Sequence, residues 1–365
     1  MKNKIVLALL GIIAGSITQC VYSNSARASL EETIEFVDDY IKNNGEKITE
    51  QHRLLQAILK GNFDDAEKAI KNGAKVNYQQ DKKSPLFYLV KREDSENSDE
   101  DVNTETENSD EYEKAEGFLL DLEYGTTLLA FAIIYKPEMV QFLLEHGANP
   151  NLSDYEGFTP LMFAADYNDN DDVTIIHLLL KFGANPNTRN SYDDPGYTAL
   201  YYAVDNENRK VIDALLKNGA NINLKYKDGQ TLLHFIITGS NLVVGSGMLE
   251  NDIKQLLVAG ANPNITDDEG FTPLNEKMSY LKNQSVTEDD VAVIKLLLQF
   301  KANPNIADNE NITPLKRAVD DKSIAIIEAL LVGGANPGVL STRDRNIMNK
   351  LLLKSSNTKK QKILK

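Results

Sequence analysis

Residues 157–165 read GFTPLMFAA and residues 179–187 read LLKFGANPN, and these two stretches decide how the chain folds. Thr159 before Pro160 is typical of a helix start, because a threonine oxygen accepts a free backbone N–H and proline fits the first helical position. The leucine pair of the second stretch supplies the apolar face of another helix, which the following glycine can end in a left-handed conformation. The two stretches therefore predict a unit of helix, turn, helix and extended loop.

The same two phrases return along most of the chain. Copies of the second phrase follow one another at intervals of 36, 36, 41, 41 and 33 residues, each preceded by a leucine pair. They begin at Gly147, Gly183, Gly219, Gly260, Lys301 and Gly334, with an earlier form at Gly73. Forms of the first phrase begin at Ser84, Thr127, Thr159, Thr198, Thr231, Thr272 and Thr313. Because one unit cannot bury both of its apolar faces, this period predicts units that stack into a solenoid.

At these residues the chain resembles the ankyrin-repeat family, whose pattern is Gly-x-Thr-Pro-Leu-His-x-Ala followed by Leu-Leu-x-x-Gly-Ala-Asp-x-Asn. The resemblance implies an all-α ankyrin-repeat solenoid of about eight helix-turn-helix units over residues 50–338, with short hairpin-like turns and capping helices at both ends. The family histidine is kept only at His234, so we expect weaker coupling between repeats. The second unit, residues 84–124, lacks the Gly-Ala-Asn turn, and we expect an insertion that splits its helices.

The amino end reads as an export signal over residues 1–28. Two lysines precede an apolar run at residues 5–14, and Ala-Arg-Ala at 26–28 suits a leader-peptidase site. This run is too short for a stable membrane span, so we expect a protein of the periplasm, the cell envelope or the medium. Lipidation at Cys20 is the alternative, which the bulky Gln19 before it disfavours.

The formal net charge of −15 is unevenly distributed. Residues 93–116 hold twelve acidic residues and one lysine and predict a disordered acidic insertion. This insertion is either a tolerated surface loop, or a segment that attracts a basic partner or binds Ca²⁺ weakly. Helical spacing predicts an N-terminal capping helix within residues 29–49. Residues 339–365 predict a C-terminal capping helix (342–354) and a basic tail. An array this acidic is unsuited to neutralising phosphates, so we expect no nucleic-acid partner.

A search for catalytic or metal-binding motifs returns little. The four histidines are far apart in the sequence, and no phosphate-binding glycine loop is present. Asp267 and Glu269 imitate part of a calcium loop, but its first position would be Ile265. We therefore expect a protein that is not an enzyme and that needs no cofactor or metal.

The family geometry implies that loop and first-helix positions line an elongated concave face. Here aromatic side chains stand among acids at those positions, a composition that suits a protein interface. We expect a monomer that binds a protein partner through Tyr155, Glu156, Phe158, Tyr167, Asp194, Tyr197, Lys227, Gln230, Asp268, Phe271, Tyr280 and Ile312. Alternatively, these aromatic rings only cover neighbouring repeats. Two other roles stay open: an envelope protein that docks or protects another envelope protein, and a host-directed effector.

Overall fold

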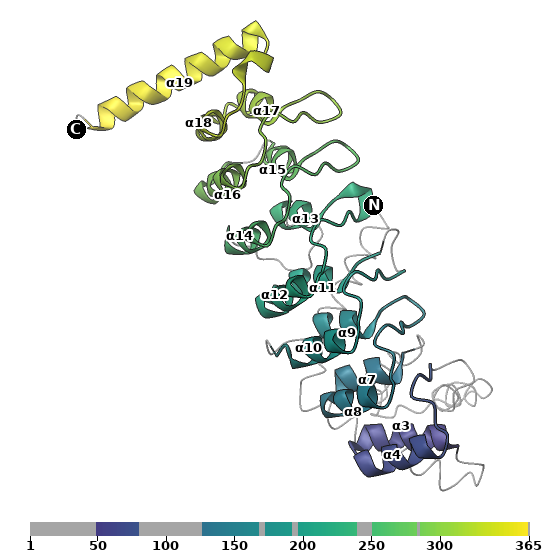
Figure 1. The fold of residues 1–365 in the computed structure, drawn as a ribbon. Helices are drawn as coiled ribbons and strands as arrows, with labels where there is room; N and C mark the ends of the chain where they lie inside the picture. The colour runs from purple at the N-terminus through teal and green to yellow at the C-terminus, as the bar shows by residue number, and fades with distance from the viewer. Residues whose placement is uncertain are drawn as a thin grey trace, which may run out of the picture. The chain divides into compact units, whose positions relative to one another are not determined.

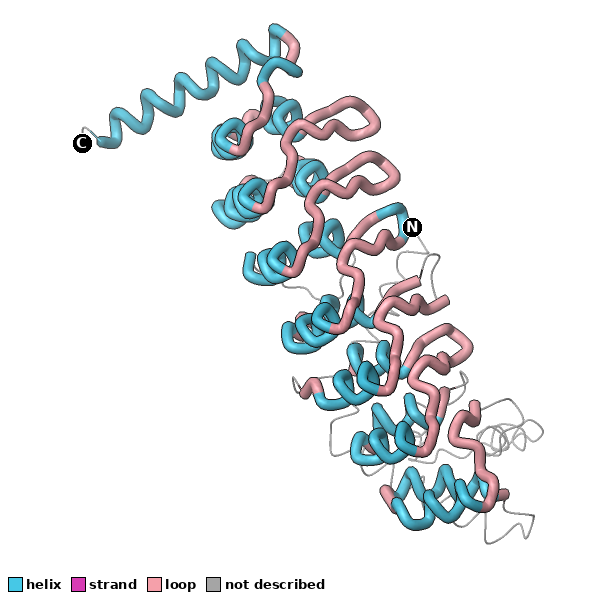
Figure 2. The backbone as a smooth tube through the Cα atoms, in the orientation of Figure 1, coloured by secondary structure: helices cyan, strands magenta, loops and turns pink. Residues whose placement is uncertain are grey.

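The computed structural model describes residues 49–79, 126–167, 172–191, 196–238, 250–282 and 285–363, with side chains up to Lys354. Within these ranges seven helix pairs follow one another, and the only β pairing is an isolated bridge between Gln79 and Thr127 (Figures 1 and 2). The all-α repeat architecture expected from the sequence is confirmed. The pairs are α3 (Glu50–Lys60) with α4 (Phe63–Lys71), α7 (Leu128–Tyr135) with α8 (Val140–Glu145), α9 (Pro160–Asp166) with α10 (Thr174–Lys181), α11 (Ala199–Asp205) with α12 (Arg209–Lys217), α13 (Leu232–Thr238) with α14 (Glu250–Val258), α15 (Pro273–Tyr280) with α16 (Glu288–Gln299), and α17 (Pro314–Asp320) with α18 (Ile324–Val332).

The chain divides into two compact units, which are described separately. The first contains residues 1–193, 197–203 and 210–219, and the second contains the remainder. Helices α3 to α10 thus lie in the first unit and α13 to α19 in the second, while the division passes through α11 and α12. Within each unit the helix pairs form successive layers, and the loops before the first helices project from one side of them (Figure 2).

The first helices begin where the threonine motif predicts. Thr159, Thr272 and Thr313 each accept the backbone N–H of the third following residue, at N···Oγ1 distances of 3.4, 3.3 and 3.4 Å. Proline occupies the first helical position in all three cases, where its missing N–H has no partner to lose. At the other end of the pair, Gly183 adopts a φ of 91° after α10, a conformation that disfavours residues with a Cβ.

The leucine pairs build the core. The first leucine of each pair is at most 1% exposed in all six copies, and burial of such a side chain contributes about 2 kcal/mol. These six residues are Leu143, Leu179, Leu215, Leu256, Leu297 and Leu330. The repeated phrase therefore marks the position that each second helix turns inward.

The last asparagine of each Gly-Ala-Asn-x-Asn phrase connects its repeat to the next. Asn151 Nδ2 donates to the carbonyl oxygen of Gly183 (2.8 Å), and its Oδ1 accepts the N–H of Asn185 (2.7 Å). The same pair of bonds is made by Asn77, Asn223, Asn264 and Asn305. The sequence alone did not predict these bonds, because their partners lie a whole repeat further along the chain.

The first helix pair stacks directly on the pair α7–α8. Asn77 Nδ2 donates to Gly147 O (3.0 Å), and Asn77 Oδ1 accepts the N–H of Asn149 (2.6 Å). The bridge from Gln79 to Thr127 joins the two loops as well. The predicted second unit, residues 84–124, lies outside the described residues.

Coupling between repeats does not depend on the family histidine alone. His234 Nε2 lies 3.0 Å from the Phe271 carbonyl oxygen, while Nδ1 accepts the N–H of Thr231 (3.1 Å). Asn275 occupies the equivalent position one repeat later, and its Nδ2 donates to Ile306 O (3.0 Å). This amide and the asparagine bonds between loops therefore also join neighbouring repeats, and the weaker coupling stays a prediction.

After the last pair, α19 (Thr342–Ile363) packs against α17 and α18, with Met348 buried. The helix continues nine residues beyond Lys354, into the stretch that was expected to be a basic tail after the capping helix, and this stretch contains neither glycine nor proline. The signal at 1–28, the capping helix at 29–49 except for Thr49, and the insertion at 93–116 lie outside the described residues. No helix within the described ranges is both long enough and apolar enough to cross a bilayer.

Candidate protein-binding face

In each of the two units, the loops before the first helices and the adjoining positions of those helices form a face, which we call the finger face of that unit. Three positions recur on it: a loop residue, the residue before the capping threonine, and the fourth residue after that threonine. The loop position holds Asp154, Asn190, Tyr226, Asp267 and Asp308. The position before threonine holds Phe158, Tyr197, Gln230, Phe271 and Ile312. The position after it holds Phe163, Tyr202, Phe235, Glu276 and Arg317.

The loop aspartates shape the backbone of the finger face. Asp154 Oδ1 accepts the N–H groups of Glu156 (3.0 Å) and Phe158 (2.8 Å). Asp267 and Asp308 make the corresponding bonds at 2.7–3.0 Å. Such Asx-type turns fix where the following acidic and apolar side chains stand. Asp267 therefore serves the loop, which accounts for its resemblance to a calcium ligand in the sequence.

These carboxylates are partly removed from water. Burial raises the pKa of Asp154 to about 6, against the opposing effect of the N–H groups that it accepts. Burial also raises the pKa of Asp267, and it raises that of Glu276 with help from the carboxylates of Asp267 and Glu269. The finger face thus carries acidic groups whose charge is only partly solvated.

Aromatic rings link the finger positions in the first unit. The ring of Phe158 lies 5.7 Å from that of Phe163 and 5.2 Å from that of Tyr202, between centroids. Tyr167 continues the row at 6.2 Å from Phe163, and Tyr197 stacks on Tyr201 at 4.0 Å. We call the partly exposed members of this row the aromatic belt, defined as Phe158, Phe163, Tyr167, Tyr197 and Tyr202.

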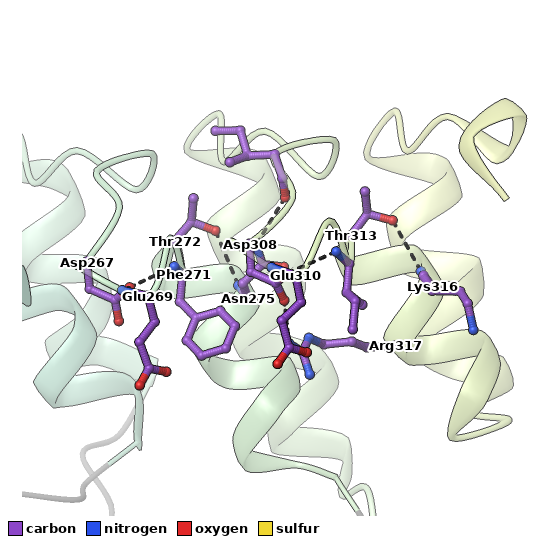
Figure 3. Close-up of polar contacts among 12 residues, drawn as sticks. Asp267, Glu269, Phe271, Thr272, Asn275, Asp308, Glu310, Thr313, Lys316 and Arg317 are labelled. Atoms are coloured by element: carbon purple, nitrogen blue, oxygen red, sulfur yellow. Dashed lines mark hydrogen bonds and ion pairs between the residues drawn. The ribbon is translucent and has the colours of Figure 1, made fainter.

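In the second unit, the fourth position after the capping threonine is occupied in one repeat by a cation, Arg317. The guanidinium of Arg317 lies 5.1 Å from the ring centroid of Phe271, within the range of a cation–π contact. Arg317 also forms an ion pair with Asp308, and the two side chains are largely buried. Figure 3 shows these residues from successive repeats on the same side of the helices.

Eleven of the twelve sequence-predicted binding residues lie in the described part of the chain, and Asp194 lies outside it. Four are exposed: Tyr155, Lys227, Asp268 and Tyr280. Seven are half-buried: Glu156, Phe158, Tyr167, Tyr197, Gln230, Phe271 and Ile312. Phe158 and Tyr167 meet through Phe163, which the sequence reasoning missed together with Tyr202 and Arg317. Their recurrence at the fourth residue after each threonine is the signal that would have found them.

Among the described residues, no group of three or more His, Cys, Asp or Glu side chains is placed to hold a metal ion. Layers of paired helices with projecting polar and aromatic loops define a helical-repeat protein.

Comparison with known proteins gives the family. A family model for ankyrin repeats matches three times, at residues 108–190, 169–244 and 241–340. The chain belongs to the ankyrin-repeat family. An ankyrin repeat protein of Rickettsia bellii is 35% identical over 119 residues, which make up 33% of this chain and 31% of the relative. The chain thus spans about a third of the length of this relative.

Two solved ankyrin structures match the chain. An ankyrin repeat domain from Acinetobacter baumannii is 26% identical with a TM-score of 0.47, covering 57% of this chain and all but 2% of that domain. The ankyrin repeat domain of Bcl-3, a member of the IkappaB protein family, is 21% identical with a TM-score of 0.52, covering 79% of this chain and 100% of that domain. Ankyrin repeats are typically non-enzymatic scaffolds for interactions between proteins.

Proposed function

We propose that the chain is an exported, monomeric, non-catalytic scaffold that binds another protein through its finger face. This proposal rests on one observation: in more than one loop, an exposed side chain stands a few positions before a half-buried aromatic ring. Tyr155 is 59% exposed beside half-buried Phe158, and exposed Asp268 stands beside half-buried Phe271. Rigid aromatic side chains surrounded by polar groups are typical anchors of protein interfaces.

Phe158 and Phe271 also serve packing between repeats, since each contacts a side chain of the following repeat. Their replacement would therefore disturb folding together with binding. The test of the proposal rests instead on Tyr155 and Tyr280, which are 59% and 44% exposed.

The experiment compares two double variants of the chain in its native organism. Y155A/Y280A removes aromatic anchors from the finger face, whereas V258A/V332A removes apolar groups that are 69% and 91% exposed on the second helices α14 and α18. We expect co-purification of the partner to fail with the first variant and to persist with the second. Equal capture by both variants would contradict the assignment of the finger face.

Export is supported by the sequence at residues 1–28 and is tested separately. Fractionation into cytoplasm, envelope and medium should recover a chain that begins near Ser29, as read by mass spectrometry of its amino end. Lipidation would instead place a modified Cys20 at the amino end, and C20S would then release the protein from the membrane fraction. Recovery of an intact amino end in the cytoplasm would refute export.

A further inference from the structure

We propose that α19 attaches the protein to the surface of an anionic phospholipid bilayer. The attachment uses one side of the helix, which we call the basic side and define as Arg343, Arg345, Lys350, Leu353 and Lys354. All five residues are exposed. This surface lies outside the finger face, so the inference goes beyond the proposed function and does not depend on it.

The basic side is the outward side of a helix that packs against α17 and α18. Successive residues of an α-helix are turned by about 100°, which places the basic side within about half of the circumference. Asp344 and Met348 fall on the opposite half, where Met348 is buried. Asp344 accepts a hydrogen bond from Ser341 Oγ (2.8 Å) and lies 3.6 Å from Lys316 Nζ of α17. The single acidic residue of 342–354 is thus held on the inner side of the helix.

The chain leaves most of the positive charge of the basic side unneutralised. Arg343, Arg345 and Lys350 form no ion pair with any residue that the structure describes. Elsewhere an exposed lysine has such a partner: Lys71 of α4 pairs with Glu67 one turn earlier (2.5 Å). In α19 no carboxylate stands three or four residues from any of the three cations, the spacing at which helical side chains meet. Their charge is therefore offered to an outside partner.

Apolar side chains stand next to these cations. Three leucines in a row follow Met348, the last buried side chain described in α19. Leu351 and Leu352 are half-buried, and Leu353 is 66% exposed. The helical backbone continues from there to Ile363, beyond α18 in the view of Figure 1. The helix thus offers leucine together with lysine and arginine where its contact with the array ends.

A bilayer matches this combination better than other polyanions do. Its headgroups attract cations, and the acyl region beneath them receives leucine side chains. A nucleic acid would neutralise the cations but leave Leu353 in water, and α19 of a second copy would bring like charges together. The acidic residues of the array act weakly on the outer part of the helix, because salt at 0.1 M screens charges beyond about 10 Å.

The test measures sedimentation of the full chain with two kinds of vesicle. One is phosphatidylcholine alone, and the other contains about 30% phosphatidylglycerol to supply negative charge. We expect stronger binding to the anionic vesicles, and release at 1 M salt, where screening acts within about 3 Å. R343Q/R345Q/K350Q should weaken this binding about a hundredfold, because each cation near an anionic surface strengthens binding about fivefold.

Two matched controls accompany these measurements. K254Q/K295Q/K322Q removes the same charge from exposed positions of the second unit outside α19 and should change binding by no more than about twofold. L353A should weaken binding about fivefold, since part of an inserted leucine is lost. V332A, at a position 91% exposed on α18, should leave binding unchanged. Every variant keeps residues 1–28, so any lipid binding by the amino end is the same in all of them.

Equal binding to neutral and anionic vesicles, no binding to either, or equal weakening by the two triple variants would overturn the proposal. Equal binding of L353A and V332A would overturn it as well, because a surface that needs charge alone suits an acidic protein segment and not a bilayer. Circular dichroism checks that each variant keeps its helices. None of these variants changes Tyr155 or Tyr280, so the co-purification test of the finger face is decided independently.

Discussion

Asp154 holds its loop together while its side chain is half-buried. Its carboxylate accepts two backbone N–H groups, yet burial favours the neutral acid and raises its pKa to about 6. Asn190 fills the equivalent position in the next repeat, where its Oδ1 accepts the N–H of Tyr197 (2.7 Å). A neutral amide therefore forms this turn without the cost of a poorly solvated charge.

Replacement of Asp154 by asparagine should stabilise the protein at neutral pH. Because the folded pKa exceeds the unfolded value, the stability that this group contributes is present below about pH 4 and is lost as the pH rises through about 6. Discounted for partial solvent exposure, the loss is about 1 kcal/mol. D154N should thus gain this amount above pH 7 and nothing near pH 4, as measured by urea unfolding across that range. A gain that does not vary with pH would contradict the assigned titration.

Lys301 stands where the other later repeats have glycine, and it adopts a φ of 67°. A side chain in this left-handed region costs about 1–2 kcal/mol, which the greater freedom of unfolded glycine partly offsets. We expect K301G to raise the free energy of unfolding by about 0.5–1 kcal/mol in chemical denaturation. The matched control K295G lies within α16 and should lower it by a similar amount. Destabilisation by K301G would show that the lysine is unstrained.

At the scale of the elements, the asparagines between loops decide how strongly neighbouring repeats are coupled. Asn264 Nδ2 donates to Lys301 O (2.9 Å), and its Oδ1 accepts the N–H of Asn303 (2.7 Å). Both bonds cross from one repeat to the next, and array stability depends on such nearest-neighbour contacts.

Loss of this side chain should therefore weaken one interface while leaving each helix pair intact. We expect N264A to cost about 1–2 kcal/mol for its two hydrogen bonds and to broaden the unfolding transition, because the repeats on either side unfold less cooperatively. Urea unfolding followed by circular dichroism measures both effects. N349A, an exposed asparagine of α19, should change stability by less than about 0.5 kcal/mol. If both variants behaved alike, the bonds between loops would be unimportant.

Across the whole molecule, local signals predicted the helices well because their causes lie within a few residues. The threonine of each Thr-Pro pair caps the helix that follows, and the first leucine of each pair is buried. The sequence left open that aromatic rings cover neighbouring repeats, but it did not identify the partners in two contacts, because these join residues more than thirty positions apart. Phe158 is partly covered by Tyr202, and Asn77 bonds to Gly147 across the segment taken for a second repeat. Spacing alone does not reveal such partners.

The direct contact between the first two described helix pairs leads to the last prediction. Since Gln79 and Thr127 form a bridge and Asn77 bonds to Gly147 and Asn149, the array does not need residues 81–125 to join these repeats. Replacing them by four residues of glycine and serine shortens the loop more than tenfold, which lowers its closure entropy by about 2 kcal/mol. We expect the shortened chain to unfold at an equal or higher temperature, as followed by circular dichroism. Restoring the length with a glycine-serine linker of 45 residues controls for loop length and should return the temperature to that of the full chain. If the shortened chain and the chain with the 45-residue linker both melted at a lower temperature, residues 81–125 would contribute packing to the array. The stability of the first repeat would then depend on those residues.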